Sequence, residues 1–271
     1  MSTTQIATRI NALFAANAAQ RRKAFIAYLT GGDPAPETTA ALVLALERGG
    51  ADLVELGVPF SDPIADGPVI QRASDRALRA GTTLPRLLES VREIRRESNI
   101  PLVLFSYLNP LLRYGFDRLA RDAAEAGVDG VLLTDLSIEE AAEAVERLRA
   151  QGLDTIFLAA PTSTDRRLRL VAEYSSGFIY LVSRTGVTGE QASLSRAAAP
   201  LVRRMREFTR LPLAVGFGVS TPDQVEEVAR VADGVVVGSA IVKCIEANAT
   251  APNLTGKLES FTRELTRPLR V

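Results

Sequence analysis

The heptapeptide Gly50-Ala51-Asp52-Leu53-Val54-Glu55-Leu56 decides the fold, because its pattern recurs twice more along the chain. The recurrences are Gly127-Val128-Asp129-Gly130-Val131-Leu132-Leu133 and Val231-Ala232-Asp233-Gly234-Val235-Val236-Val237. Each follows a helical pattern and opens a short run rich in β-branched residues or leucine. Glycine ends the helix in the first two, and the apolar run is typical of a strand buried on both faces. Repetition of helix, turn and buried strand predicts a parallel sheet.

Five further apolar runs bring the predicted strands to eight. They are Phe25 to Leu29, Leu102 to Ser106, Thr155 to Leu158, Phe178 to Val182 and Leu213 to Val215. Helical stretches with apolar stripes separate them. Eight alternations in 271 residues predict an α/β fold, a single (β/α)8 TIM barrel domain spanning residues 1–271. An open doubly wound sheet is the alternative, because periodicity alone cannot show closure.

Local signals place several helix starts. Ser137-Ile138-Glu139-Glu140 predicts a capping box, and Thr221 is a cap residue just ahead of Pro222. An extra N-terminal helix is expected before the first strand, because apolar residues there share one helical face. These residues are Ile6, Ile10, Leu13 and Phe14.

Composition excludes several classes of chemistry. Lys plus Arg number 32 and Asp plus Glu also 32, so net charge gives no reason to expect nucleic acid or an anionic membrane as partner. The chain has no histidine and one cysteine, Cys244, which we expect to be a buried small hydrophobe. His-based triads, an internal disulfide and the common zinc sites are therefore excluded, and we expect no metal. No signal-peptide or membrane-spanning run is found, so we expect a cytoplasmic protein.

Glycines at the ends of the last two strands predict a phosphate site. The seventh strand runs into Gly216-Phe217-Gly218-Val219-Ser220 and the eighth into Gly238-Ser239-Ala240-Ile241. The apolar stretch after Ser239 can begin a short helix, whose free N–H groups and positive dipole end would hold a phosphate without Lys or Arg. Barrels commonly bind phosphate at this place. Glycines that merely permit tight turns are the alternative for either motif alone.

Two carboxylates lie at the same predicted face. Glu55 ends the second strand in an apolar setting that would raise its pKa, and Asp66 follows in a proline-rich loop. Taken alone, Glu55 could be solvated or paired, and Asp66 could be a turn residue before Gly67. Asp62 is a better candidate for a purely structural turn. The long loop 183–192 has the composition of a lid, but an idle surface loop would look the same.

Long motifs in order along the chain resemble the tryptophan synthase alpha subunit family. They are residues 55–68, Leu29-Thr30-Gly31-Gly32-Asp33-Pro34, Tyr107-Leu108-Asn109-Pro110, Ala160-Pro161-Thr162-Ser163, Ser183-Arg184-Thr185-Gly186-Val187-Thr188-Gly189, Gly216-Phe217-Gly218 and Gly238-Ser239-Ala240-Ile241-Val242. The resemblance covers nearly the whole chain. Several motifs in one order are far more specific than any one of them.

The resemblance implies retro-aldol cleavage of indole-3-glycerol phosphate to indole and glyceraldehyde 3-phosphate. Glu55 matches the general acid/base, and Asp66 the carboxylate that faces the indole nitrogen as positive charge develops. Tyr180 matches a tyrosine near the catalytic glutamate and is expected to be catalytic together with Glu55 and Asp66. The remaining implied roles are phosphate binding by Gly189, Gly218, Gly238 and Ser239, indole-pocket walls from Tyr28, Phe105 and Phe217, and loop closure by Thr188 and Arg184.

The resemblance also implies a partner. We expect a complex of two alpha and two beta chains, in which the beta subunit carries pyridoxal phosphate and this chain needs no cofactor. The contact surface should include the loops after strands two and six and residues near Asn109 and Pro110. Ser137 stands where the family usually has proline, in a loop facing the partner, and Tyr28 stands where phenylalanine also occurs.

Three other functions are weighed. An isomerase of a phosphoribosyl compound would want acid/base residues at the exits of strands one and five, where none stands. A non-catalytic barrel that only activates a beta subunit would not need both Glu55 and Asp66. A free-standing indole producer would have the same chemistry without a partner.

Overall fold

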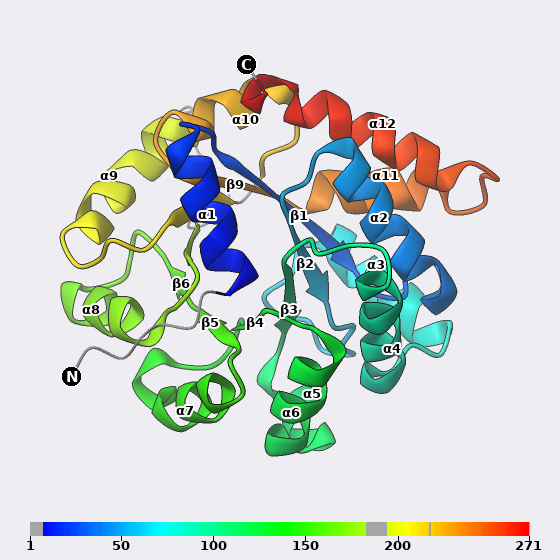
Figure 1. Ribbon diagram of the computed structural model, residues 1–271, viewed down its shortest axis with the longest axis horizontal. Helices are drawn as coiled ribbons and strands as arrows, with labels where there is room; N and C mark the ends of the chain where they lie inside the picture. The colour runs from blue at the N-terminus through cyan, green and yellow to red at the C-terminus, as the bar shows by residue number, and fades with distance from the viewer. Residues whose placement is uncertain (1–7, 183–193, 217, 271) are drawn as a thin grey trace.

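Parallel strands form a closed barrel in the computed structural model, which describes residues 8–182, 194–216 and 218–270 (Figure 1). Nine strands are found there, in the order β5-β4-β3-β2-β1-β9-β8-β7-β6, and every pairing is parallel. They are β1 (Ala24–Thr30), β2 (Leu53–Gly57), β3 (Leu102–Ser106), β4 (Gly130–Leu133), β5 (Asp154–Ile156), β6 (Leu158–Ala159), β7 (Ile179–Val182), β8 (Leu213–Gly216) and β9 (Gly234–Val237).

The fifth predicted strand closes the barrel and is divided in doing so. Residues 154–156 pair with β4, residues 158–159 pair with β7, and Phe157 lies between the two short strands. The amide of Tyr180 donates to the Phe157 carbonyl oxygen at 3.1 Å, so this carbonyl keeps a hydrogen-bond partner although the strand is divided there. The eight predicted strand positions are thereby confirmed, the prediction of one continuous strand over 155–158 is wrong, and the open sheet is excluded.

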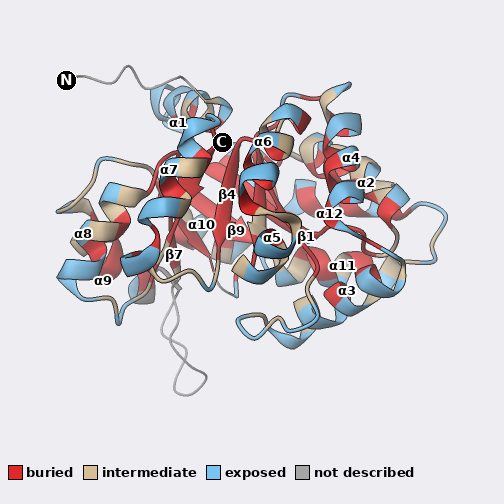
Figure 2. Ribbon diagram, turned by 90° about the horizontal axis from the view of Figure 1, so that it is seen from below, coloured by how far each residue is buried: buried red, intermediate tan, exposed pale blue. Residues whose placement is uncertain are grey.

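Helices surround the strands, and the outward faces of these helices are exposed to solvent (Figure 2). They are α1 (Arg9–Ala19), η1 (Pro36–Thr38), α2 (Thr39–Gly49), α3 (Pro68–Arg79), α4 (Leu84–Arg95), α5 (Leu108–Tyr114), α6 (Phe116–Ala126), η2 (Ile138–Glu140), α7 (Ala142–Ala150), α8 (Asp165–Tyr174), α9 (Leu194–Arg206), α10 (Pro222–Ala229), α11 (Ser239–Asn248), α12 (Leu254–Thr266) and η3 (Arg267–Leu269). None of the helices in the described part of the chain is long and apolar enough to cross a membrane.

The first helix closes one end of the barrel, as Figure 1 shows. Ile10 and Phe14 are buried against the inward-facing side chains of the strands, and the Phe14 and Phe178 ring centroids lie 5.8 Å apart. The predicted N-terminal helix is confirmed, although Ile6 lies outside the described residues.

The predicted helix starts have mixed outcomes. Thr221 caps α10 in a full capping box with Gln224. No capping box forms at Ser137, because its hydroxyl donates to the carboxylate of Glu139 and the segment is a short 3-10 helix. Cys244 is half-buried on α11, packed against the core, where full burial was expected.

The aspartates of the repeated phrase tie the strands together at their amino ends. Asp52 accepts the amide of Phe25 at 2.7 Å, Asp129 that of Leu102 at 2.8 Å, and Asp233 that of Leu213 at 2.9 Å. In each case the aspartate precedes one strand and binds the start of another. The amide would otherwise lack a partner in the sheet, which explains why the phrase carries aspartate.

Replacing Asp129 with alanine is expected to destabilise the fold by about 3 kcal/mol or more. The Asp129 carboxylate is buried and accepts from Arg95 and Arg9 at 2.8 Å as well as from Leu102, so its loss leaves the charge of the largely buried Arg95 guanidinium without its carboxylate. Urea unfolding measures the change. The exposed pair Asp75–Arg79 supplies a control, since Asp75→Ala should cost less than about 1 kcal/mol. Equal losses in the two variants would contradict this role for Asp129.

Candidate active site

Alternation along β2 turns Glu55 into the barrel. Val54 and Leu56 pack in the layer between strands and helices, whereas Leu53 belongs to the barrel interior. Successive side chains of a strand point to opposite faces, so Glu55 lies on the same side as Leu53, one step nearer the carboxyl end. Tyr28 is its register partner on β1. Glu55 is therefore the last inward-facing side chain of β2, because Gly57, two residues further on, has none.

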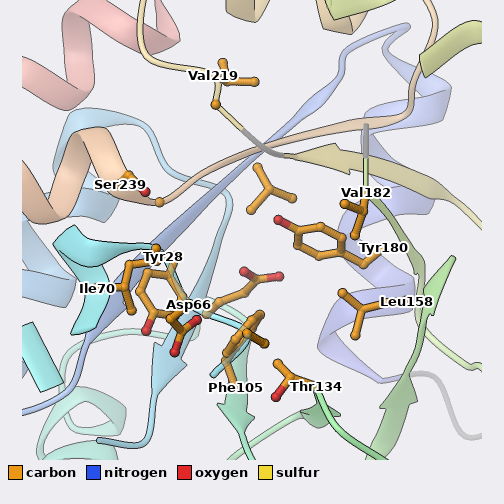
Figure 3. Close-up of a pocket in the computed structure, with 16 residues that line it drawn as sticks. Tyr28, Asp66, Ile70, Phe105, Thr134, Leu158, Tyr180, Val182, Val219 and Ser239 are labelled. Atoms are coloured by element: carbon orange, nitrogen blue, oxygen red, sulfur yellow. The ribbon is translucent and has the colours of Figure 1, made fainter. Parts of the chain in front are cut away.

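A cavity of about 330 Å³ opens at this end of the barrel (Figure 3). In Figure 3, Tyr180 and Leu158 lie on the other side of the cavity from Tyr28 and Asp66. The lining comes from most of the strands and the loops that follow them. It consists of Tyr28, Glu55, Ala65, Asp66, Gly67, Ile70, Phe105, Thr134, Leu158, Tyr180, Val182, Gly218, Val219, Val236, Gly238 and Ser239. The walls are mainly apolar, with two carboxylates among them.

Glu55 is buried and has no hydrogen-bond partner among the residues that the structure describes. The residue is only 1% exposed, and its Oε1 accepts no hydrogen bond from the described residues. Burial raises the pKa of Glu55 to about 8, because the charged form loses its hydration and gains no compensating donor. The carboxyl group is therefore mostly protonated at neutral pH, yet it loses its proton when the pH rises by one or two units above neutrality.

Asp66 is held by a tyrosine that the sequence argument assigned no role. The Tyr107 hydroxyl donates to Asp66 Oδ2 at 3.1 Å and accepts the amide of Ala65 at 2.9 Å. Burial raises the pKa of Asp66 to about 6, and the hydrogen bond from Tyr107 opposes that rise. Two sequence signals could have singled out Tyr107: it directly follows β3 at the carboxyl end of the barrel, and it opens the motif Tyr107-Leu108-Asn109-Pro110.

Asp66 and Asp62 have different surroundings within the same loop. The Asp66 amide donates to the Pro63 carbonyl oxygen at 3.0 Å, so Asp66 does close a turn, while its carboxylate faces the cavity. Asp62 is exposed, lies outside the cavity lining, and accepts the Ser61 hydroxyl. The structural role expected for Asp62 fits this position.

Two tyrosines flank the buried glutamate, and glycines make room for both. Burial raises the pKa of Tyr180, and the charge of Glu55 raises it further. A Cβ atom at Gly216 would lie 2.3 Å from the Tyr180 hydroxyl oxygen, and one at Gly57 would lie 2.3 Å from that of Tyr28. The Tyr28 and Phe105 rings meet edge to face, with centroids 5.2 Å apart. Any side chain at either glycine would displace a cavity wall.

Three of the four predicted phosphate residues, Gly218, Gly238 and Ser239, line this cavity. Gly238 is the N-cap of α11 and Ser239 its first residue, so the first free N–H groups of this helix lie at the cavity. Gly218 has a φ of +80°, a left-handed conformation that favours glycine, and also lines the cavity. Four of the predicted site residues lie outside the described residues: Arg184, Thr188, Gly189 and Phe217.

A ladder of ion pairs joins the two helices that bear on the site. Arg76 on α3 binds both carboxylate oxygens of buried Asp33 at 2.8 Å and reaches Glu246 on α11 at 2.7 Å. Arg72, also on α3, binds Glu246 through two hydrogen bonds of 2.9 Å. Because α3 follows the Asp66 loop and α11 begins at Ser239, these ion pairs hold the Asp66 loop in place relative to the candidate phosphate site.

The cavity is also lined by residues that the sequence did not single out. The missed residues are apolar or weakly polar side chains with no chemical motif of their own, Ile70, Thr134, Leu158, Val182, Val219 and Val236 among them. No group of three or more acidic or cysteine side chains that could hold a metal ion occurs in the described part of the chain.

Comparisons with known proteins agree on one family. The family model for the tryptophan synthase alpha chain matches residues 14–269. The tryptophan synthase alpha chain of Solibacter usitatus is 63% identical over 260 residues, covering 96% of this chain and 97% of its own. That of Geobacter sulfurreducens is 51% identical, covering 95% and 97%. A crystal structure of the alpha subunit from Legionella pneumophila superposes with a TM-score of 0.88 at 36% identity, covering 97% and 98%. A tryptophan synthase structure from M. tuberculosis superposes equally well at 37% identity, covering 97% and 99%.

Replacing Glu55 with glutamine is expected to change stability in a pH-dependent way. The folded protein holds this proton more tightly than the unfolded chain, whose glutamate titrates near its ordinary 4.5, so wild-type stability falls as pH rises from there to about 8. Glutamine cannot ionise. Urea unfolding should therefore find the variant more stable than wild type at pH 9, by up to roughly 4 kcal/mol, and close to it at pH 5. A difference independent of pH would contradict the buried, unpartnered state of Glu55.

Proposed function

The chain belongs to the tryptophan synthase alpha chain family, a family of indole-3-glycerol-phosphate lyases, and from this premise we propose that Glu55 and Asp66 carry its lyase reaction. The reaction is the cleavage of indole-3-glycerol phosphate to indole and glyceraldehyde 3-phosphate. One observation supports the assignment above all: two carboxyl groups face one apolar cavity, and their pKa values differ by about two units. Groups whose environments separate their pKa values in this way suit acid and base roles at one pH.

Glu55 moves the proton. In its protonated form it donates to the indole carbon that bears the glycerol chain, and the resulting carboxylate takes the proton of the adjacent glycerol hydroxyl. That hydroxyl then becomes the aldehyde of glyceraldehyde 3-phosphate as the carbon–carbon bond breaks. The electrons of the broken bond move into the ring and restore its aromaticity. A pKa of about 8 supports both halves of this exchange near neutrality.

Asp66 stabilises charge. Protonation of the ring carbon leaves positive charge on the indole nitrogen, which a fixed carboxylate stabilises more in the transition state than in the ground state. Its pKa of about 6 keeps Asp66 mainly ionised at neutral pH, and Tyr107 holds its orientation.

The other site residues bind and orient the substrate. Tyr28, Phe105 and Phe217 form walls for the indole ring, and Tyr180 excludes water beside Glu55. The phosphate binds the backbone at Gly189, Gly218, Gly238 and Ser239, supported by the positive end of α11. Thr188 and Arg184 close the neighbouring loop over the bound substrate.

The product passes to a partner. The alpha chain needs no cofactor, and the pyridoxal phosphate of the complex sits in the beta subunit. We place the beta subunit against the loop that carries Asp66 and against α5, in a cytoplasmic complex of two alpha and two beta chains. Two large apolar side chains support this surface: Ile64 is 86% exposed in that loop, and Leu112 is 56% exposed on the helix that contains Asn109 and Pro110.

Glu55→Gln is expected to lower indole release from indole-3-glycerol phosphate by at least about 100-fold, since the proton donor and acceptor is lost. Asp66→Asn should lower it by about 100-fold, because the amide is neutral. The matched control is Asp62→Asn in the same loop, assayed on the chain alone, which should stay within about twofold of wild type, since Asp62 lies outside the cavity. Unchanged turnover in both site variants would overturn the assignment and favour a barrel that only activates a beta subunit.

Added beta subunit is expected to raise turnover, because docking against the Asp66 loop fixes a carboxylate that the isolated chain holds through one hydrogen bond from Tyr107. The measurement compares indole release by the purified chain with and without saturating beta subunit. Ile64→Ser should weaken this activation while leaving the turnover of the isolated chain unchanged. Equal turnover with and without the partner would favour a free-standing indole producer.

A further inference from the structure

A second cavity, of about 460 Å³, lies at the opposite end of the barrel from the candidate active site. Its walls include Lys23, Pro212 and Asp233, which immediately precede β1, β8 and β9. The remaining walls come from the end of α1 and the segment after α9. No residue lines both cavities, so the two are separate sites.

The charge around this second cavity is strongly unbalanced. Five cationic side chains line it against one carboxylate, that of Asp233: they are Arg21, Arg22, Lys23, Arg206 and Arg210. Arg206 forms an ion pair with Asp233, and the Lys23 ammonium lies 3.7 Å from the same carboxylate. Arg22 pairs with Asp52 at 3.5 Å. The guanidinium groups of Arg21 and Arg210 make no hydrogen bond or ion pair with any residue that the structure describes. In a protein with no net charge, this concentration of positive charge is local.

A buried donor without a partner lines the same cavity. Asn17 is 5% exposed, and its Nδ2 makes no hydrogen bond within the described chain. Leaving a buried donor unpaired costs free energy, so a ligand in this cavity that supplies an acceptor for Asn17 would be favoured. An amide donor beside guanidinium groups suits the oxygen atoms of an anion.

Arg21 adopts a backbone conformation that favours glycine. Its φ is 55°, and it is the one non-glycine residue with positive φ among those described. The Arg21 amide donates to the Ala18 carbonyl oxygen at 3.1 Å and the Arg22 amide to that of Asn17 at 2.8 Å, the pattern of a Schellman motif at the end of α1. Glycine fits this position with least strain, so the strain retained with arginine points to a use for its side chain.

We propose that this second cavity binds a small polyanion that carries phosphate groups, of the chemical class of inorganic diphosphate. The excess of cations calls for more than one negative charge, and a cavity of this volume fits a small ion of that class. One guanidinium group can bind two phosphate oxygens at once. The guanidinium groups of Arg21 and Arg210 have no partner among the described residues and are free to do so. Because the walls precede three strands and hold the end of α1, an anion there binds together segments that are distant in sequence.

The test is a calorimetric titration of the whole chain with inorganic diphosphate, in the presence of saturating glycerol 3-phosphate to occupy the phosphate site near Ser239. One equivalent should bind, and more weakly as salt is raised. Arg21→Gly and Arg210→Gln should each weaken binding by about tenfold or more, the loss expected for one charge-assisted contact. Arg203→Gln, an exposed arginine of α9 outside the cavity lining, should change it by less than about twofold.

Arg21→Gly also separates loss of the ligand from loss of the fold. Glycine relieves the positive φ, so the melting temperature of the free variant should not fall below that of wild type while diphosphate binding is lost. Diphosphate should raise the melting temperature of wild type but not of either cavity variant. Absence of binding, or equal affinity in the cavity variants and Arg203→Gln, would overturn the proposal and leave a solvated cluster of arginines. Failure of glycerol 3-phosphate to bind would instead contradict the phosphate site proposed near Ser239, and the arginine variants would still locate the diphosphate.

Discussion

A strand inside a closed (β/α)8 barrel is buried on both faces, and its side chains alternate between the helix layer and the barrel interior. On β2, this constraint sends Val54 and Leu56 to the helices and Glu55 to the interior. A register shift of one residue would exchange the two sets. The same alternation brings Tyr28 and Phe105 into the cavity wall, so the composition of the site follows from the phase of each strand.

Burying a carboxyl group without a partner costs stability, and the cost is what gives Glu55 its chemistry. A hydrogen bond or a nearby arginine would stabilise the carboxylate and return its pKa toward the ordinary range. Asp66 is the contrasting case: it is less deeply buried, an aspartate ordinarily has a lower pKa than a glutamate, and the Tyr107 hydroxyl donates to its carboxylate, so its pKa lies about two units below that of Glu55. One cavity thus holds a proton donor and an anion at the same pH.

The two ends of the barrel divide stability from chemistry. At the amino ends of the strands, Asp52, Asp129 and Asp233 bind strand amides and arginines, so their charges are compensated. At the carboxyl ends, Glu55 and the start of α11 keep unsatisfied groups facing a cavity. The excess positive charge near Arg21 breaks this division, which is why that cavity stands out at an end of the barrel that otherwise serves stability.

The amino-acid sequence alone was enough to predict eight buried parallel strands alternating with helices, the position of Glu55 at a strand end and the glycines before α11, because these depend on the period of apolar residues and on local backbone freedom. It also led to three wrong local inferences: the continuous strand over 155–158, the full burial of Cys244 and the capping box at Ser137, whose hydroxyl binds Glu139 instead. Tertiary structure alone decided the closure through β5 and β6, the isolation of Glu55, the contact of Tyr107 with Asp66 and the cavity around Arg21. These depend on distances between residues far apart in the chain, which only long-range packing sets.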